Sequence, residues 1–454
     1  MSAGTTTKQF FQTIFYYIYR RYNAHAIRMQ FRLTDTGKFI FASIIISGAL
    51  GIDTQLTMAF VVFTLLFSIF FISIFYVIRF NINIEVSRII SPYAAALTPF
   101  NYKVQIISYS ERDQSGLELI DMPSDPRPSL NEFLTAREPQ ESKRNIYDRT
   151  LAFYRWAWLI DKKNHGIKPK VIEIPTLYTN KSVEIQINII PESRGVFSFK
   201  EIIICKSDPI GLFRAFHKIP LAESIYILPR QYPIPLVHLD ETRKYNLGGV
   251  TSALSVGDSM EFYAIRDYIY GDSIRHIDWK GWAKTDKPVI KEYHEEYFSR
   301  HGLALDTFGD SDYVDAFEGA VTVAASLILA IKSQETLIDF MFVEDVVHSI
   351  TVGRGLAHKI NVMELLSVVT LNETNSIDLL SQSLIEKIRI LSGIVLIFIK
   401  WDKERKELVD YLRSAGIPVK VFYIKRSSDE LKINSSGITL IELEDINSGL
   451  KDVI

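Results

Sequence analysis

Residues 257–296 have the sequence GDSMEFYAIRDYIYGDSIRHIDWKGWAKTDKPVIKEYHEE, and they separate two halves of different character. Charges of alternating sign surround aromatic rings in this segment. They are Arg266, Asp267, Asp272, Arg275, Asp278 and Lys280, placed around Tyr268, Tyr270, Trp279 and Trp282. A solvated charged face does not need two tryptophans, and a core does not tolerate so many unpaired ions. We therefore expect Asp272, Arg275 and Asp278 to form buried or half-buried ion pairs, in the fold or in an interface.

The length and composition of the chain limit its class. It has 454 residues, too many for one compact core, so two or three domains are expected. A net charge of -2 gives no global attraction to nucleic acid, which is therefore not an expected partner. The single cysteine, Cys205, forms no internal disulfide, which suits a reducing compartment.

Two apolar runs near the N-terminus predict a membrane anchor. Residues 39–52 and 56–78 are almost uninterrupted apolar sequence, separated by a short turn. The second run has the roughly 20 apolar residues that span a bilayer, and the first suits a tilted span or a thinner bilayer. A polar and aromatic segment precedes them, so a cleaved signal peptide is not expected. The sequence thus predicts a two-helix transmembrane hairpin over residues 39–79.

Basic residues predict the orientation of this hairpin. The turn between the two spans contains none. Before the first span stand Lys8, Arg20, Arg21, Arg28, Arg32 and Lys38, and after the second span stand Arg79 and Arg88. Because Lys and Arg are retained on the cytoplasmic side, both termini are expected in the cytoplasm. The expected location is the bacterial inner (plasma) membrane, with membrane lipid as a partner.

Residues 1–38 form a basic and aromatic head. Phe11, Ile14, Phe15, Ile18 and Tyr22 recur at helical spacing. An amphipathic helix lying on the membrane surface fits this pattern, and so does a cytoplasmic helix packed on its own protein.

Residues 80–235 change to a strand pattern. Short alternating runs occur at 171–174, 183–187 and 196–199, with turn residues between them. Such alternation predicts antiparallel strands and a small β-sandwich. Residues 107–149 are polar and rich in proline, so they are expected to be a mobile insertion.

Residues 299–454 alternate between apolar strands and helices, after a linking signature segment at 236–298. The expected strands are 301–306, 337–343, 393–399 and 419–424, and the expected helices are 313–333, 359–370, 377–391 and 403–415. Near-continuous apolar strands between helices predict a doubly wound, parallel α/β sheet.

The end of the first of these strands is a candidate metal site, because ligands of open α/β sheets bind at the carboxyl ends of strands. The loop after Asp306 resembles the Asp-x-Ser-x-Ser loop of von Willebrand factor A-like domains, in which an aspartate and two hydroxyls help to hold a divalent cation. Here Phe308 and Asp310 replace the two serines. Asp402 is a candidate distal carboxylate and Thr351 a remote candidate hydroxyl. A degenerate Mg²⁺ site and simple capping of the following helix both fit.

Other catalytic patterns are missing from the sequence. It contains no Gly-x-x-x-x-Gly-Lys-Ser/Thr loop and no Gly-x-Ser-x-Gly elbow. His276 and His294 stand beside carboxylates, an arrangement more typical of a charged network than of acid–base catalysis. We therefore expect no enzymatic activity.

The segment at 257–296 is similar to the signature of the bacterial and archaeal "domain of unknown function 58" family. The matching residues are 258–262, 266–268, 271–272, 275–280 and 283–284, with 193–197 and 208–213 upstream. Lys284 stands where the family has arginine, and Tyr270 where proline is common. The resemblance implies a membrane-tethered partner of a MoxR-type AAA ATPase, active in chaperone-like assembly or maturation, with a von Willebrand factor A-like domain that binds proteins.

The sequence is consistent with two functions. The first is a non-enzymatic, membrane-anchored scaffold without a cofactor, which binds a MoxR-type AAA ATPase and client proteins. The alternative is a metal-dependent hydrolase that uses Asp306, Asp310 and Asp402. The signature network consists of Arg266, Tyr268, Gly271, Asp272, Arg275, Asp278 and Trp279.

Overall fold

The computed structural model divides the chain into two compact units, Met1–Arg230 and Gln231–Ile454. The structure describes residues 3–51, 57–234, 245–246, 261–272, 274–294, 297–330, 336–343, 346–352, 356–372, 377–426 and 437–451.

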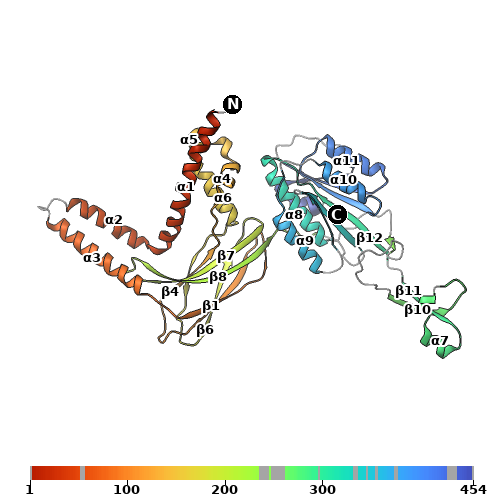
Figure 1. The fold of residues 1–454 in the computed structure, drawn as a ribbon, viewed down its shortest axis with the longest axis horizontal. Coiled ribbons are helices and arrows are strands. Elements are labelled where there is room, and N and C mark those ends of the chain that lie inside the picture. Colours follow the sequence, from red (N-terminus) through yellow and green to blue (C-terminus); the bar gives the residue numbers. More distant parts are fainter. Residues whose placement is uncertain are drawn as a thin grey trace. The chain divides into compact units, whose positions relative to one another are not determined.

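The first unit begins with three long helices, α1 (Ala3–Arg32), α2 (Asp35–Leu50) and α3 (Thr57–Arg79). Thr34 caps α2 by accepting a 3.0 Å hydrogen bond from the Gly37 N–H, which separates α2 from α1. Helices α2 and α3 run side by side as a hairpin (Figure 1). Apolar side chains cover its outside: Phe39, Ile45, Ile46, Leu50, Met58, Phe60, Leu65, Phe71, Ile72, Phe75 and Ile78 are all exposed.

Two helical segments among the described residues are long and apolar enough to cross a membrane, Met58–Arg79 and Ser311–Ala330. Only 6% of the first apolar window is buried, whereas 67% of the second is buried inside the C-terminal unit. The second is therefore a core helix of that unit. Helix α2 has 16 residues, fewer than the roughly 20 that span a bilayer without thinning it. The number of spans and the side of the termini stay predictions.

The rest of the first unit is built on two facing sheets. A three-stranded sheet has the order β1-β3-β6, and a five-stranded sheet has the order β2-β8-β7-β4-β5. The strands are β1 (Ile84–Ile89), β2 (Tyr93–Ala95), β3 (Phe100–Ser108), β4 (Leu117–Pro123), β5 (Val171–Ile174), β6 (Ser182–Ile189), β7 (Gly195–Ser207) and β8 (Arg214–Leu228). Inward residues of both sheets share one core, which includes Val104, Ile106, Leu119, Ile202 and Ile225.

The expectation that residues 107–149 form a mobile insertion is corrected, because strand β4 lies within this range. Leu117, Leu119 and Ile120 are buried, and β4 pairs with β5 and β7. The polar and proline-rich residues around this strand concealed it. After β4 the chain forms helices α4 (Leu130–Thr135), α5 (Ile146–Leu151) and α6 (Phe153–Lys163), with the short helix η1 (Glu141–Lys143).

A loop before β8 fixes the helical hairpin on this sandwich. The Thr34 hydroxyl donates to the carbonyls of Gly211 (2.5 Å) and Leu212 (3.0 Å), and the Thr34 N–H donates to Leu212 O (3.1 Å). A Cβ atom on Gly37 would lie 2.2 Å from Leu212 O, so this close approach requires glycine. The joint between the hairpin and the sandwich is therefore hydrogen-bonded and closely packed.

The second unit contains the α/β sheet, ordered β14-β13-β12-β15-β16-β17, with the short strand β9 (Tyr245–Asn246) paired to β12. Its strands are β12 (Tyr297–Leu305), β13 (Thr336–Val343), β14 (Val347–Val352), β15 (Gly393–Phe398), β16 (Val419–Lys425) and β17 (Ile438–Glu442). Its helices are α8 (Val314–Ala330), α9 (Leu356–Val368), α10 (Asp378–Lys387), α11 (Lys403–Ser414) and α12 (Ile446–Lys451), with η3 (Ser311–Tyr313) and η4 (Leu443–Asp445). Helices α8 and α9 lie on one side of the sheet and α10 and α11 on the other (Figure 1).

The α/β expectation holds, with one difference. Strands β12, β13, β15, β16 and β17 are parallel, but β14 is antiparallel to β13 and forms an edge. A separate antiparallel hairpin precedes this sheet, made of β10 (Glu261–Asp267) and β11 (Val289–His294), and it carries η2 (Ile274–His276) and α7 (Trp279–Thr285).

Candidate functional site

Asp306 lies at the carboxyl end of the central strand β12, where the sheet of an α/β protein meets its ligand. Its side chain is fully buried. Oδ1 accepts hydrogen bonds from Arg405 Nη2 (2.9 Å) and from the Phe308 N–H (3.1 Å). Oδ2 accepts from Arg405 Nε (2.7 Å) and from the Ile399 N–H (3.3 Å). A carboxylate has about four acceptor positions, and these four donors use all of them.

Arg405 is a buried side chain in the first turn of α11. It meets Asp306 with two parallel hydrogen bonds, the strong geometry of an arginine–carboxylate pair. Its third nitrogen, Nη1, donates to Asp402 Oδ2 at 2.6 Å. Burial raises the pKa of the Asp306 carboxyl, and the charge of Arg405 opposes this change. One guanidinium therefore joins Asp306 and Asp402, two of the three carboxylates that were candidate ligands of a cation.

Asp310 and Asp402 both cap helices. Capping was one of the two interpretations of Asp310, whereas the cap formed by Asp402 was not predicted. Asp402 Oδ1 accepts from the Arg405 N–H (3.1 Å) at the start of α11. Asp310 accepts from the Asp312 N–H (3.0 Å) at the start of η3 and is exposed. Neither bond needs a metal ion.

Thr351, the remote candidate hydroxyl, lies elsewhere. It donates to Asp339 Oδ1 (2.5 Å), whose other oxygen binds Arg300 Nε (2.8 Å). Arg300 lies in the first half of β12 and Asp306 follows the end of this strand, so Thr351 lies toward the opposite end of the sheet. Within the described residues no group of three or more His, Cys, Asp or Glu is arranged to hold a metal ion.

Sequence reasoning missed Arg405. Its one signal is the spacing Asp402-x-x-Arg405 at a predicted helix start, which places both side chains on the same turn. The partner that matters, Asp306, is 99 residues away along the chain, and no local pattern indicates that pairing.

The signature segment forms a compact charged hairpin. Arg266 on β10 donates to Asp272 from Nη1 (2.7 Å) and Nη2 (2.9 Å), and the Ile269 N–H donates to Asp272 Oδ2 (3.0 Å). The hydrogen bonds from Arg266 lower the pKa of Asp272 to about 2, helped by the Ile269 bond. The expected half-buried ion pair of Asp272 is thus present, with Arg266 as its partner.

The other signature residues shape the same hairpin. Gly271 has φ +109°, a backbone conformation in which a residue with a Cβ atom would be strained. Glycine is therefore favoured at this turn. The Tyr268 N–H donates to Pro288 O (2.9 Å), joining the hairpin across its base. Asp278 precedes α7 and lies 3.6 Å from Lys291 Nζ. Arg275 lies in η2, and the expectation for its side chain falls outside the described part of the chain.

The two tryptophans of this hairpin are exposed. Their rings stack with centroids 5.5 Å apart and planes at 17°. Trp279 is 63% exposed and Trp282 36%. Tyr270, Ile269 and Ile274 are exposed on the same hairpin. Isolated apolar residues on a surface need no explanation, but a stacked tryptophan pair among other exposed apolar residues is typical of a binding surface.

A second buried charge cluster lies inside the sandwich. Arg88 donates to Asp121 from Nε (3.0 Å) and Nη2 (2.7 Å), and Tyr102 OH donates to Asp121 Oδ2 (2.9 Å). Arg88 also donates to Glu223 Oε2 (3.1 Å) and lies 4.2 Å from the centre of the Phe199 ring. Burial raises the pKa of both Asp121 and Tyr102. Arg88 follows Val86 at an inward strand position, so the period of two in β1 could have indicated it.

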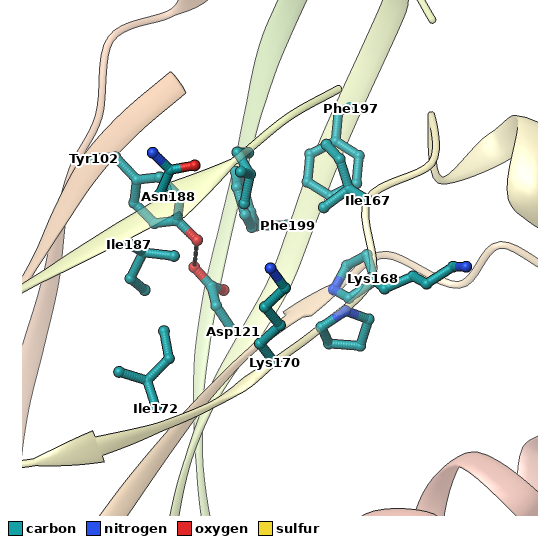
Figure 2. Close-up of a pocket in the computed structure, with 13 residues that line it drawn as sticks. Tyr102, Asp121, Ile167, Lys168, Lys170, Ile172, Ile187, Asn188, Phe197 and Phe199 are labelled. Carbon is teal, nitrogen blue, oxygen red and sulfur yellow. Dashed lines mark hydrogen bonds between the residues drawn. The ribbon is translucent and has the colours of Figure 1, made fainter. Parts of the chain in front are cut away.

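A small cavity opens beside this cluster, as Figure 2 shows, with Tyr102, Asp121, Lys170, Phe197 and Phe199 around it. Its volume is about 40 Å³. This is room for a few water molecules and far below the roughly 300–1,000 Å³ of small-molecule sites. The cavity is therefore no candidate for an organic ligand.

Comparison with known proteins identifies the middle of the chain. Residues 264–389 match the family described as "Protein of unknown function DUF58". The DUF58 match begins in β10, contains the tryptophan hairpin and Asp306, and ends just after α10, before Asp402 and Arg405. No curated protein matches the chain.

Solved structures are also similar to part of the chain, and one of them can be named. It is the crystal structure of manganese-loaded Plasmodium vivax TRAP protein, with 13% sequence identity and a TM-score of 0.24. The likeness covers 34% of this chain and 72% of that one. At this TM-score it carries no argument about ligands, and the α/β assignment of the DUF58 region depends on the sheet itself.

Proposed function

We propose that this protein is a non-enzymatic, membrane-anchored scaffold of the DUF58 family that binds other proteins, with a MoxR-type AAA ATPase as its main partner. The carboxyl end of the sheet supports a binding role over metal-dependent chemistry. There Arg405 occupies the carboxylate of Asp306, the residue on which the alternative, a metal-dependent hydrolase, depends.

The closed carboxylate argues against cation binding. All four acceptor positions of Asp306 are used, and Arg405 also holds Asp402. A divalent cation at Asp306 would have to displace a buried guanidinium from this carboxylate and leave it with only Asp402 and the Phe308 carbonyl as partners, at a cost of several kcal/mol. Isothermal titration calorimetry of the full chain with Mg²⁺, Mn²⁺ and Ca²⁺ should therefore give no binding heat. Stoichiometric binding that Asp306→Asn abolishes would instead support the hydrolase.

The hairpin of α2 and α3 supports the anchor. A soluble protein rarely exposes a contiguous apolar patch above a few hundred Å², and here the apolar residues surround both helices. Lipid around the hairpin would remove the free-energy cost of exposing this apolar surface to water. Alkaline extraction of native membranes should leave the chain in the membrane pellet, and Ile72→Lys with Phe71→Lys should release it. Release of the unaltered chain would contradict the anchor.

The exposed tryptophan pair supports protein binding. Trp and Tyr dominate the energetics of protein interfaces, and the Arg266–Asp272 pair holds this hairpin in one conformation before any partner binds. The family resemblance supports a MoxR-type AAA ATPase as the partner. Trp279→Ala with Trp282→Ala should abolish co-purification of that ATPase, whereas Tyr411→Ala, at an exposed aromatic residue on α11, should leave it unchanged.

A further inference from the structure

Helix α1 has two contrasting faces over residues 10–23, where its side chains are described. One face is buried against the chain itself. Tyr16 is 1% exposed, with its ring 5.8 Å from that of Phe133 and 5.7 Å from that of Trp156, and Gln12 donates to Arg149 O (3.2 Å). The other face is open and apolar. It consists of Phe10, Phe11, Ile14, Tyr17, Ile18 and Tyr22, each at least 41% exposed.

The cover of the buried face comes from the segment between β4 and β5. Helices α4, α5 and α6 contact α1 from one side, and the hairpin of α2 and α3 extends on the other side (Figure 1). Helix α1 also runs across the direction of the hairpin rather than along it. The Thr34 bonds to Gly211 and Leu212 fix the corner between α1 and α2.

We propose that α1 lies flat in the headgroup region of the bilayer from which the hairpin inserts, with its open face in contact with anionic lipid. This inference rests on the proposed anchor. A hairpin that enters along the bilayer normal leaves a helix running across it parallel to the membrane surface, and α4 to α6 then cover the face of α1 that points away from lipid.

The chemistry of α1 matches an anionic lipid surface. Four of the six residues on its open face are aromatic, and tyrosine and other amphipathic rings concentrate at membrane interfaces. Residues 1–34 contain five basic residues, Lys8, Arg20, Arg21, Arg28 and Arg32, and no Asp or Glu. Basic residues next to a membrane segment are attracted by anionic headgroups. The open residues cover about 18 Å of helix, at 1.5 Å per residue, so α1 contacts several headgroups.

Site-directed spin labelling tests this placement in the full chain. Single cysteines replace Ile14 and Ile18 on α1, Ile72 on α3 or Tyr178 on the sandwich, all in a Cys205→Ala background. The labelled chains are reconstituted into vesicles of phosphatidylcholine and phosphatidylglycerol. Access of each label to oxygen, which enters lipid, and to a water-soluble nickel chelate is then measured.

The labels at 14 and 18 should lose access to the chelate and keep access to oxygen, at a shallower depth than the label at 72, while the label at 178 stays in water. Chelate access at 14 and 18 equal to that at 178, with 72 in lipid, would overturn the proposal for α1 alone. Loss of access to both reagents at 14 and 18 would place protein on this face and overturn it too. A label at 72 in water would instead refute the anchor.

Discussion

Replacing Arg405 with methionine tests how much the buried Arg405–Asp306 pair at the carboxyl end of the sheet stabilises the second unit. The change keeps most of the aliphatic volume but removes the donors that hold Asp306 and Asp402. Asp306 then stays fully buried with only two backbone donors and no opposite charge. Breaking one side of a buried ion pair costs about 3–5 kcal/mol. For a unit of this size that loss lowers the melting temperature by about 6–20 °C.

The assay is thermal melting of the full chain in detergent, combined with hydrogen exchange of peptides from β12 and β15. Arg413→Met on the same helix is the matched control, because that side chain is partly exposed and makes one bond to Gly437 O. The control should stay within about 1 kcal/mol of the wild type. Adding Asp306→Asn to Arg405→Met removes the buried charge and should recover part of the loss.

A melting temperature of Arg405→Met equal to that of Arg413→Met would refute this reasoning. So would unchanged hydrogen exchange in β12 and β15. Either result would mean that Asp306 does not depend on Arg405 for its charge balance.

Three further predictions concern the first unit. Gly37→Val should force the hairpin away from Leu212 O, and faster hydrogen exchange at the loop before β8 would report it, whereas unchanged exchange would contradict the close approach. Burial raises the pKa of Cys205 to about 12, so iodoacetamide should not alkylate it at neutral pH until the chain unfolds; rapid labelling of the native chain would show that the thiol is accessible. Burial lowers the pKa of His165 below its unfolded value of about 6.5. Its contribution to the free energy of unfolding is therefore complete above about pH 6.5 and is lost as the pH falls through the folded pKa. Urea unfolding of His165→Phe should lack this part of the pH dependence.

Much of the fold could be predicted from the sequence, because the decisive patterns are local. The apolar runs at 301–306 and 393–399 became the central parallel strands β12 and β15. The edge strand β14 was not predicted, since an edge strand is half exposed and its sequence, VHSITV, is half polar. Strand β4 was not predicted because its apolar residues stand among prolines and charges.

The candidate site was less predictable, because its chemistry depends on contacts between distant residues. Asp306 was found from its place at a strand end, but the residue that sets its role, Arg405, comes 99 positions later. Asp272 was expected in an ion pair, and Arg266 rather than Arg275 is the partner that the structure describes. The exposure of Trp279 also depends on the hairpin as a whole.

Photo-crosslinking from position 279 in native membranes tests whether the tryptophan hairpin binds an AAA ATPase. A photoreactive phenylalanine analogue replaces Trp279, or Tyr411 as the exposed control, in the full chain. Position 279 should crosslink to an AAA ATPase, and position 411 should not. The same ATPase crosslinked equally from both positions, or no ATPase from position 279, would contradict it.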